Sequence, residues 1–594
     1  MFNLFIMNLS TLDWGIIALF FVVFLVIGIR VSKQAGSSAK EFFLSGRNMP
    51  WWLIGVSMVA TTFSADTPNL VTDIVRTNGV AGNWSWWAFL VTGMVTVFIY
   101  AKLWRKSGVM TDLEFYEIRY SGKAARFLRA FRAIYLGFFF NVMIMATVTL
   151  AGIKIGGVLF GLSPVQSILI ASIITVIYSS LGGLRGVILT DFLQFIIAMV
   201  GSVGAAIYVM NMPEIGGLDT LLTHPNVTDK LNILPDFSDP AAYVPLIIVP
   251  LAVQWWSVWY PGAEPGGGGY IAQRMLSAKN EKHAVLATLL FNVTHYALRP
   301  WPWIIIALAS LVVYPDLASI QTAFPDISEK IVKDDLGYSA MLLNLPSGLL
   351  GIVVASLIAA FMSTISTHLN WGSSYLVHDF YERFVKPEAS EKEKVMVGRI
   401  STVVLMIFTG LLALVLENAL EAFEILLQIG AGTGSIFILR WFWWRVNAWS
   451  EISGMIVSFI VAVLLKAFPT GLESHWELIL GVGITTVTWV LVTFLTKPED
   501  DKTLEKFYNL VTPYGMGWNR FKTKMQFAGV SLKEGTGKFS ADLMAVILGI
   551  FIVYSALFAI GMLVYGELTN GVILAVITVA SSIGLIRIWR KLSF

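Results

Sequence analysis

The sequence predicts an all-α polytopic membrane protein with about 15 transmembrane helices. Three observations carry this prediction: 56% of the 594 residues are hydrophobic, only 13% are charged, and the mean hydropathy is +0.73. Soluble domains contain about 25% charged residues. The chain is therefore too apolar for a soluble protein, and most of its helices should contact lipid.

The expected helices follow from length, because a helix that crosses the bilayer needs roughly 20 mostly apolar residues. Fifteen stretches qualify, in chain order 13–31, 49–72, 84–104, 130–155, 163–181, 186–211, 242–260, 283–314, 341–378, 398–416, 420–440, 450–467, 475–496, 541–565 and 570–588.

Basic residues are distributed unevenly between the connecting loops. The loop 30–47 holds four Lys and Arg residues, and the segment 102–132 holds eight. By contrast, the loops 212–241 and 315–339 each carry five acidic residues against one or two lysines. Because basic loops face the cytoplasm, we expect a protein of the cell (inner) membrane with its N-terminus outside and its C-terminus inside.

Composition disfavours several function classes. A net charge of +3 is too small to indicate a surface that binds nucleic acid. A chain without cysteine has no disulfides and no thiol chemistry. No nucleophile and base pair, metal cluster or phosphate loop occurs at workable spacing, and the run PGGGGY at 265–270 lacks the Lys and Ser or Thr of a nucleotide loop. We therefore expect no enzyme. Residues 1–15 lack a basic leader and a cleavage site, so no removable signal peptide is expected.

The stretch VATTFSADTP, residues 59–68, places hydroxyls, a carboxylate and a proline inside an apolar span. Pro68 cannot donate to the carbonyl of Ser64, so the helix should kink or unwind there. Neighbouring hydroxyls alone can satisfy such a kink, or the freed carbonyls can line a cavity and bind a ligand. Asp66 favours the second interpretation, because an intramembrane carboxylate is usually functional.

A second polar surface lies on the span 341–378. At 100° per residue its small and hydroxylated residues fall within an arc of about 160°; they are Ala360, Ser363, Thr364, Ser366 and Thr367. Uncharged oxygen ligands suit a hard, weakly bound monovalent cation. Small hydroxylated faces also serve helix packing, so this face by itself leaves both interpretations open.

Three longer motifs carry a resemblance to a known family. AAFMSTISTHLNWGSSYLVHDFY at 359–381, YSSLGGLRGVILTDFLQ at 178–194 and YIAQRMLSAKNEKHA at 270–284 together resemble the sodium:solute symporter family, which includes sodium-glucose and sodium-proline carriers. The resemblance extends over about residues 13–496. It implies a leucine-transporter type of fold, in which two inverted repeats of five helices each begin with a helix broken at the membrane midplane.

The resemblance as far as residue 496, and the composition and apolar length of the remainder, together imply a division of the chain. The expected parts are an extra N-terminal helix and loop at 1–48, a first inverted repeat at 49–211, a second inverted repeat at 242–440, two accessory helices at 450–496, a cytoplasmic linker at 497–540 and C-terminal helices at 541–594.

Sodium ligands are also implied by the resemblance. In the family the main sodium site uses two carbonyls of the first core helix with one carbonyl and two hydroxyls of the eighth. These ligands match Ala60, Phe63, Ala360, Ser363 and Thr364.

Some members of the family bind a second sodium ion at an aspartate on the fifth core helix. That aspartate matches Asp191, and the accompanying hydroxyls match Ser363, Ser366 and Thr367. The alternative is that Asp191 pairs with a neighbouring base and binds no ion.

The solute residues implied by the resemblance are Asp66, Thr67, Arg299, Trp259 and Tyr260. Asp66 and Thr67 match positions that face the solute, and Arg299 lies near a lysine position of the sugar carriers. The two rings end the sixth core helix, where they could gate or stack on a solute or simply pack. The following segment, YPGAEPGGGGY at 260–270, departs from the family pattern, so no binding residue is carried across it.

These features predict a sodium-coupled symporter that imports a small polar solute by alternating access and functions as a monomer in the lipid bilayer. A sugar or polyol is favoured, because an acid and a base in one cavity can both hydrogen-bond a solute with many hydroxyls. Alternatives are a sodium symporter for a carboxylate or amino acid, a proton-coupled carrier using Asp66 or Asp191, and an ion channel or sensor without solute transport.

The predicted topology can be tested by cysteine labelling in intact cells. A cysteine replacing Ser328 should react with a membrane-impermeant thiol reagent, whereas one replacing Ser593 should not, because the 315–339 loop is expected outside and the C-terminus inside. The chain has no native cysteine to confuse the readout. Both variants should label after permeabilisation, and the reverse pattern in intact cells would overturn the topology.

Overall fold

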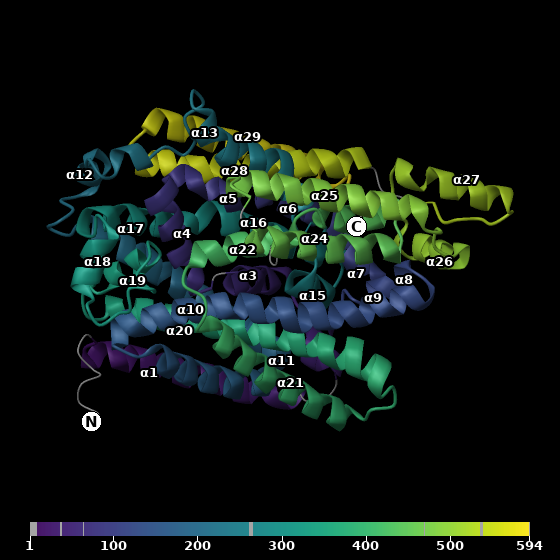
Figure 1. Ribbon diagram of the computed structural model, residues 1–594, viewed down its shortest axis with the longest axis horizontal. Coiled ribbons are helices and arrows are strands. Elements are labelled where there is room, and N and C mark those ends of the chain that lie inside the picture. Colours follow the sequence, from purple (N-terminus) through teal and green to yellow (C-terminus); the bar gives the residue numbers. More distant parts are fainter. Residues whose placement is uncertain are drawn as a thin grey trace.

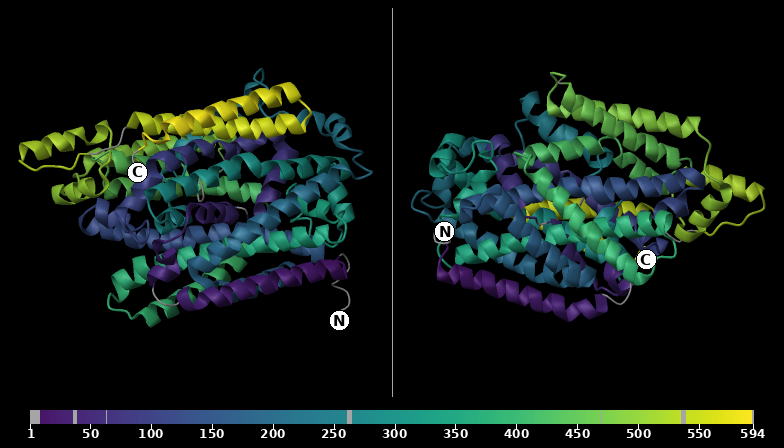
Figure 2. Two further views of the ribbon diagram at one scale, coloured as in Figure 1. Left: turned by 180° about the vertical axis from the view of Figure 1, so that it is seen from behind. Right: turned by 60° about the horizontal axis from the view of Figure 1, so that its bottom comes forward.

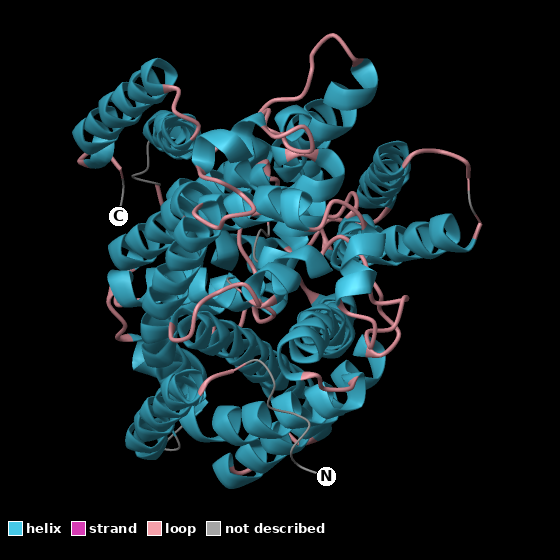
Figure 3. Cartoon of the chain, turned by 90° about the vertical axis from the view of Figure 1, so that its left-hand side faces the viewer, coloured by secondary structure: helices cyan, strands magenta, loops and turns pink. Residues whose placement is uncertain are grey.

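The computed structural model is a bundle of long helices that run side by side along the longest axis of the molecule (Figure 1). It describes residues 9–35, 39–62, 64–260, 265–468, 470–534 and 539–592, so Phe63 and Ser593 lie outside the described residues. Regular structure in the described residues is helical, without a strand (Figure 3). The all-α membrane architecture predicted from the composition is confirmed.

The N-terminal part and the segment expected to form the first repeat contain the following helices. They are α1 (Thr11–Ala35), α2 (Ala39–Leu44), η1 (Ser45–Arg47), α3 (Trp51–Thr62), α4 (Asp66–Asn78), η2 (Val80–Asn83), α5 (Trp84–Trp87), α6 (Phe89–Val95), η3 (Thr96–Tyr100), α7 (Ala101–Ser107), α8 (Phe115–Arg119), α9 (Gly122–Ile134), η4 (Tyr135–Phe140), α10 (Asn141–Phe160) and α11 (Pro164–Met210).

A loop region with α12 (Leu218–Thr223) and η5 (Thr228–Lys230) leads to the segment expected to form the second repeat. Its helices are α13 (Pro240–Tyr243), η6 (Val244–Ile248), η7 (Pro250–Gln254), α14 (Trp255–Ser257), α15 (Gly269–Ser277), α16 (Glu281–Val293), η8 (Thr294–Leu298), α17 (Pro300–Val313), α18 (Leu317–Ala323), α19 (Leu336–Leu342), α20 (Leu349–Ser374), η9 (Tyr375–Val385), α21 (Glu391–Ala413), α22 (Ala419–Gly430) and α23 (Gly434–Phe442).

The C-terminal part consists of α24 (Ala448–Ala467), α25 (Ser474–Leu495), α26 (Asp501–Val511), η10 (Met516–Trp518), α27 (Asn519–Phe527), α28 (Phe539–Val564) and α29 (Leu568–Trp589). Helices α26 and α27 lie at one end of the bundle, and α12, α18 and α19 lie at the other (Figure 1). At the edges of the bundle, α1 and the pair α28–α29 lie on opposite sides (Figure 2).

Twelve helices within the described ranges are long and apolar enough to cross a membrane. The other three predicted spans are built from shorter or merged pieces. The span 49–72 corresponds to α3 and α4, the span 420–440 to α22 and α23, and the span 163–181 to the first half of α11. Each departs from a single straight helix for a physical reason.

Helix α11 doubles back on itself. As one straight helix its 47 residues would extend about 70 Å at 1.5 Å per residue, far more than the hydrocarbon thickness of about 30 Å. Its two ends instead reach the same end of the bundle, since Ser167 packs on Gly156 near the end of α10 and Gly204 packs on Leu349 at the start of α20. The two halves therefore cross in opposite directions, as the separate predicted spans require.

The break predicted near Pro68 lies between α3 and α4, just before the proline. Helix α4 begins at Asp66, so Pro68 occupies its first turn, where the missing N–H costs nothing because it would have no intrahelical partner. The break is held by local hydrogen bonds: the Thr67 N–H donates to the Ser64 carbonyl (3.2 Å), and the Ser64 N–H donates to Thr67 Oγ1 (3.3 Å).

Two further interruptions are joined by strand-like pairing. Val258, just after α14, forms an antiparallel bridge with Ala431 at the end of α22, and the Trp259 N–H donates to the Gly430 carbonyl (3.2 Å). Met49, before α3, forms a parallel bridge with Ala278, after α15. Because backbone groups at membrane depth need partners, the Val258–Ala431 bridge satisfies backbone groups where α14 and α22 end.

A carboxylate of α1 caps another helix of the bundle. Asp13 Oδ1 accepts hydrogen bonds from the Gly348 N–H (2.7 Å) and the Gly351 N–H (2.8 Å) at the start of α20. The first N–H groups of a helix have no intrahelical partner, and an acid there also opposes the helix dipole. This contact fixes α1 beside α20.

Gly351 is expected to be required for this close approach. A Cβ at Gly351 would lie 2.7 Å from Asp13 Cα and 2.8 Å from Asp13 Oδ1. We expect Gly351→Ala to destabilise the protein by about 1–3 kcal/mol through overpacking, seen as a lower melting temperature in detergent. Gly483→Ala is the matched control, because a Cβ there meets nothing within 4 Å. Equal melting temperatures for the two variants would contradict the role of this contact.

Candidate functional site

A polar cavity lies beside the break between α3 and α4 and encloses about 110 Å³. Its lining comes from helices far apart in the sequence: Thr61, Thr62, Ser64, Asp66, Thr67, Leu70, Val71, Trp86, Phe89, Ile144, Val148, Tyr260, Tyr270, His295, Tyr296, Arg299, Thr364, His368 and Phe423. A concave site with a few converging polar groups among aromatic rings is typical of small-molecule binding.

Four of the five predicted solute residues meet in this cavity. Asp66 and Thr67 open α4, Arg299 joins η8 to α17, and Tyr260 follows α14. The fifth, Trp259, is buried outside the lining, where its ring contacts Phe140 at a centroid distance of 4.8 Å.

Arg299 is fully enclosed by the bundle. Its Nη1 donates to the Val59 carbonyl (3.3 Å), and its guanidinium lies 5.1 Å from the ring centre of Trp303. By contrast, Asp66 Oδ1 is buried without a hydrogen-bond partner. A buried carboxylate oxygen without a partner is costly, so Asp66 is poised to accept a hydrogen bond from a ligand in the cavity.

Aromatic rings form one wall of the cavity. The ring of Tyr260 stacks on the ring of Phe89 with a centroid distance of 5.9 Å, and it forms an edge-to-face contact with the ring of Phe423 with a centroid distance of 5.1 Å. Two histidines add polar atoms that the sequence analysis did not identify: His295 Nδ1 lies 3.2 Å from Thr62 Oγ1, and His368 Nδ1 lies 2.6 Å from Asn141 Oδ1. No local pattern marks these histidines, because only the packing of distant helices brings them to the cavity.

Carbonyls at the end of α3 receive hydrogen bonds from α20 and α4. Thr364 Oγ1 donates to the Thr61 carbonyl (3.0 Å), and Thr67 Oγ1 donates to the Thr62 carbonyl (3.4 Å). Ala60 and Ala360 are buried in the same α3–α20 region of the bundle. Of the five residues predicted to bind sodium, Phe63 lies outside the described residues.

Asp191 lies at the centre of a buried cluster that joins four helices. Its two oxygens accept hydrogen bonds from Ser57 of α3 and Ser363 of α20. Arg274 Nη2 of α15 lies 3.5 Å from Asp191 Oδ2. Of the other residues predicted for a second sodium site, Ser366 Oγ donates to the Ser363 carbonyl of its own helix (3.0 Å), and Thr367 Oγ1 accepts from Arg274 Nη2 (3.1 Å).

Sequence reasoning did not assign Arg274 to the site. The residue stands in the motif YIAQRMLSAKN, which carried part of the family resemblance. A fully buried arginine is rare unless it is paired, but nothing in the sequence shows that its partner is Asp191, 83 positions earlier.

Buried ion pairs also hold one end of the bundle together. Lys154 Nζ of α10 lies 2.5 Å from Asp335, and Arg76 Nε of α4 lies 2.8 Å from Asp334 Oδ1. Asn418 Nδ2 donates to Asp73 Oδ2 (2.9 Å) at the start of α22. Helix α4 is therefore tied to α22 and to the loop before α19.

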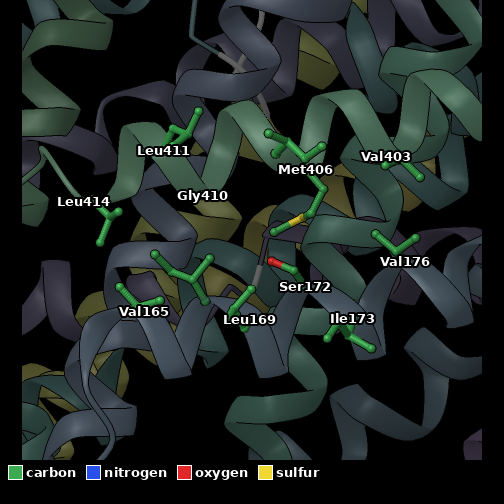
Figure 4. Close-up of a pocket in the computed structure, with 12 residues that line it drawn as sticks. Val165, Leu169, Ser172, Ile173, Val176, Val403, Met406, Gly410, Leu411 and Leu414 are labelled. Atoms are coloured by element: carbon green, nitrogen blue, oxygen red, sulfur yellow. The ribbon is translucent and has the colours of Figure 1, made fainter.

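A separate groove of about 460 Å³ lies between the first half of α11 and α21 (Figure 4). Its lining is apolar apart from Ser172, and several lining side chains, including Leu169 and Ile407, are more than half exposed on the outer surface of the bundle. It is distinct from the polar cavity and contains none of the predicted site residues.

The fold and the site define a class of protein: a multi-pass helical membrane protein of the leucine-transporter type, with broken helices around a central polar cavity. The sodium:solute symporter family model matches residues 42–458. The chain therefore belongs to the sodium:solute symporter family, whose members couple solute transport to sodium, as its motifs predicted.

Individual relatives and structures agree with this assignment. The sodium/glucose cotransporter of Vibrio parahaemolyticus is 25% identical over 512 residues, covering 83% of this chain and 92% of the relative. Sodium/glucose cotransporter 1 of Mus musculus is 27% identical and covers 82% and 79%. The structure of a Na⁺-coupled sialic acid symporter in a substrate-bound, outward-open state has a TM-score of 0.64 at 22% identity, covering 83% and 99%.

The Thr364 hydroxyl is expected to contribute to sodium binding. Thr364→Ala removes a hydroxyl oxygen and its bond to the Thr61 carbonyl, so the sodium concentration for half-maximal thermal stabilisation should rise tenfold or more, about 1.4 kcal/mol. Thr409→Ala is the matched control: this buried hydroxyl donates to the Leu405 carbonyl of its own helix, α21 (2.8 Å). An unchanged sodium requirement in a folded Thr364→Ala protein would exclude this ligand.

Proposed function

We propose that this protein is a sodium-coupled secondary active symporter that imports a small polar organic solute, with a sugar or polyol favoured. The observation that carries the proposal is that one cavity joins two kinds of polar group. Thr61, Thr62 and Thr364, beside the broken helix, line the same cavity as Asp66 and Arg299. An ion and a solute bound there would share helices and could affect each other's affinity.

The proposed sodium ligands are oxygens without full charge. They are the carbonyls of Ala60, Phe63 and Ala360 and the hydroxyls of Ser363 and Thr364. Such ligands suit a weakly bound monovalent ion that must also be released. A hydroxyl that donates one hydrogen bond retains lone pairs to coordinate a cation, so the bonds from Ser363 and Thr364 are compatible with this role.

The character of the solute is inferred from the charges and rings of the cavity. Asp66 and Arg299 offer opposite charges, each able to make charge-assisted hydrogen bonds worth about 1.5–3 kcal/mol. A neutral solute with many hydroxyls can use both, whereas an anion would compete with Asp66 for Arg299. The rings of Phe89 and Tyr260 offer flat apolar surface beside these groups. The names of the sodium/glucose relatives point the same way.

Coupling follows from linkage between the two ligands. Sodium bound at the break between α3 and α4 would stabilise the end of α3 that also lines the solute cavity. A ligand shifts a conformational equilibrium only through different affinities for its two states. Each inward sodium charge contributes about 2.3 kcal/mol per 100 mV of membrane potential. Because the potential is negative inside the cell, import is the direction that it drives.

A transport assay tests the proposal directly. Purified protein in proteoliposomes should take up a radiolabelled neutral sugar or polyol saturably when sodium is higher outside, with equal pH on both sides and a protonophore present. Uptake only of organic anions or amino acids would replace the sugar assignment but retain the symporter. Uptake driven by a pH gradient without sodium, or ion conduction without saturable uptake, would overturn sodium symport.

A substitution at Asp66 separates the effect on solute binding from the effect on sodium binding. Asp66→Asn should weaken affinity for the neutral solute by about tenfold to a hundredfold, the equivalent of one charge-assisted hydrogen bond. Stabilisation by sodium alone should remain, because Asp66 is not a proposed sodium ligand. Asp219→Asn on the exposed part of α12 is the control for loss of an acid. Wild-type solute affinity in Asp66→Asn would show that this carboxylate is structural.

A further inference from the structure

Arg274 places a permanent positive charge inside the bundle. It lies on α15, its side chain is fully buried, and it makes hydrogen bonds to two other helices. Arg274 Nε donates to Ser57 Oγ (2.9 Å), and Nη2 donates to Thr61 Oγ1 (2.6 Å), both on α3. Nη2 also donates to Thr367 Oγ1 on α20 (3.1 Å).

The oxygens around this guanidinium overlap with those of the predicted second sodium site. Asp191 supplies the only full negative charge of that predicted ligand set, and its Oδ2 lies 3.5 Å from Arg274 Nη2, with both side chains completely buried. Thr367, a second member of the set, also accepts from Arg274. The guanidinium therefore already contacts the carboxylate and one of the three hydroxyls expected to bind an ion.

The remaining members of the set have other partners. Ser363 donates to Asp191, and Ser366 donates to the Ser363 carbonyl of its own helix (3.0 Å). Asp191 thus receives hydrogen bonds from Ser57 and Ser363 and has the charge of Arg274 beside it.

The balance of charges also disfavours a second sodium ion at Asp191. Asp191 and Arg274 neutralise each other with both side chains fully buried. An additional sodium ion at Asp191 would place two positive charges beside one carboxylate. Two positive charges at short distance repel each other strongly in a buried site. Arginine cannot relieve this by losing its proton, because it remains charged in proteins.

We propose that Arg274 is a tethered cation that takes the place of a second sodium ion, so that the protein binds one sodium ion per chain. This inference rests on the proposed sodium symport and specifies its stoichiometry. Asp191 then acts as the counter-ion of Arg274, and its link to Ser363 connects this fixed charge to a proposed ligand of the main sodium site.

Sodium counting on the purified full-length chain tests the proposal. Equilibrium binding of radioactive ²²Na⁺ alone should give one saturable site per wild-type chain. Arg274→Gln removes the charge but keeps hydrogen-bonding capacity, so it should bind two sodium ions. Arg274→Lys keeps the positive charge and should bind one. The double variant Arg274→Gln with Asp191→Asn removes both charges and should return the count to one.

Removal of one partner of a buried pair can be strongly destabilising, so Ser366→Ala provides a second measurement in a protein that keeps the Arg274–Asp191 pair. Because the hydrogen bond that Ser366 makes among the described residues is to its own helix, its removal should leave the sodium count at one and the sodium affinity within twofold of wild type.

Each outcome has a defined meaning. Two sodium ions on the wild-type chain, one on a folded Arg274→Gln chain, or a tenfold loss of sodium affinity in Ser366→Ala would each overturn the role of Arg274. A complete lack of saturable sodium binding to wild type would instead overturn the proposed sodium symport on which this inference rests.

Discussion

Backbone N–H and C=O groups inside a bilayer have no water to bond, and this constraint governs where the helices of this protein break. The carbonyls at the end of α3 receive hydrogen bonds from Thr364, Thr67 and Arg299. The interruptions after α14 and α22 pair with each other through Val258 and Ala431. Non-helical backbone at membrane depth is tolerated only where protein or a cavity satisfies it, so the breaks and the cavity depend on each other.

Buried charges follow the same rule, and their pairing determines which helices are joined. Arg274 and Asp191 join α15 to α11, and Lys154 and Asp335 join α10 to the segment before α19. Asp66 differs, because it lines the cavity and its buried Oδ1 has no hydrogen-bond partner. Charges that are satisfied within the protein hold the bundle together, whereas an unsatisfied one is available to a ligand.

Much of this arrangement could be predicted from the sequence, because membrane helices are specified locally. Hydropathy located the spans, and Pro68 located the first break to within a few residues, since a proline is compatible with the first turn of α4 but not with the middle of a helix. The spans 49–72 and 420–440 are each broken into two helices, because these breaks depend on partners in distant parts of the chain that length and hydropathy do not describe.

The sequence by itself determined the membrane architecture and the family, because composition, apolar length and contiguous motifs are properties of neighbouring residues. Only the tertiary structure decided which distant groups meet. It placed Tyr260 in the cavity but its neighbour Trp259 against Phe140, and it brought Arg274 to Asp191 from 83 residues away. The physical reason is that a charge or ring acquires its role from what surrounds it in three dimensions, and helices packed side by side bring together residues that no local pattern connects.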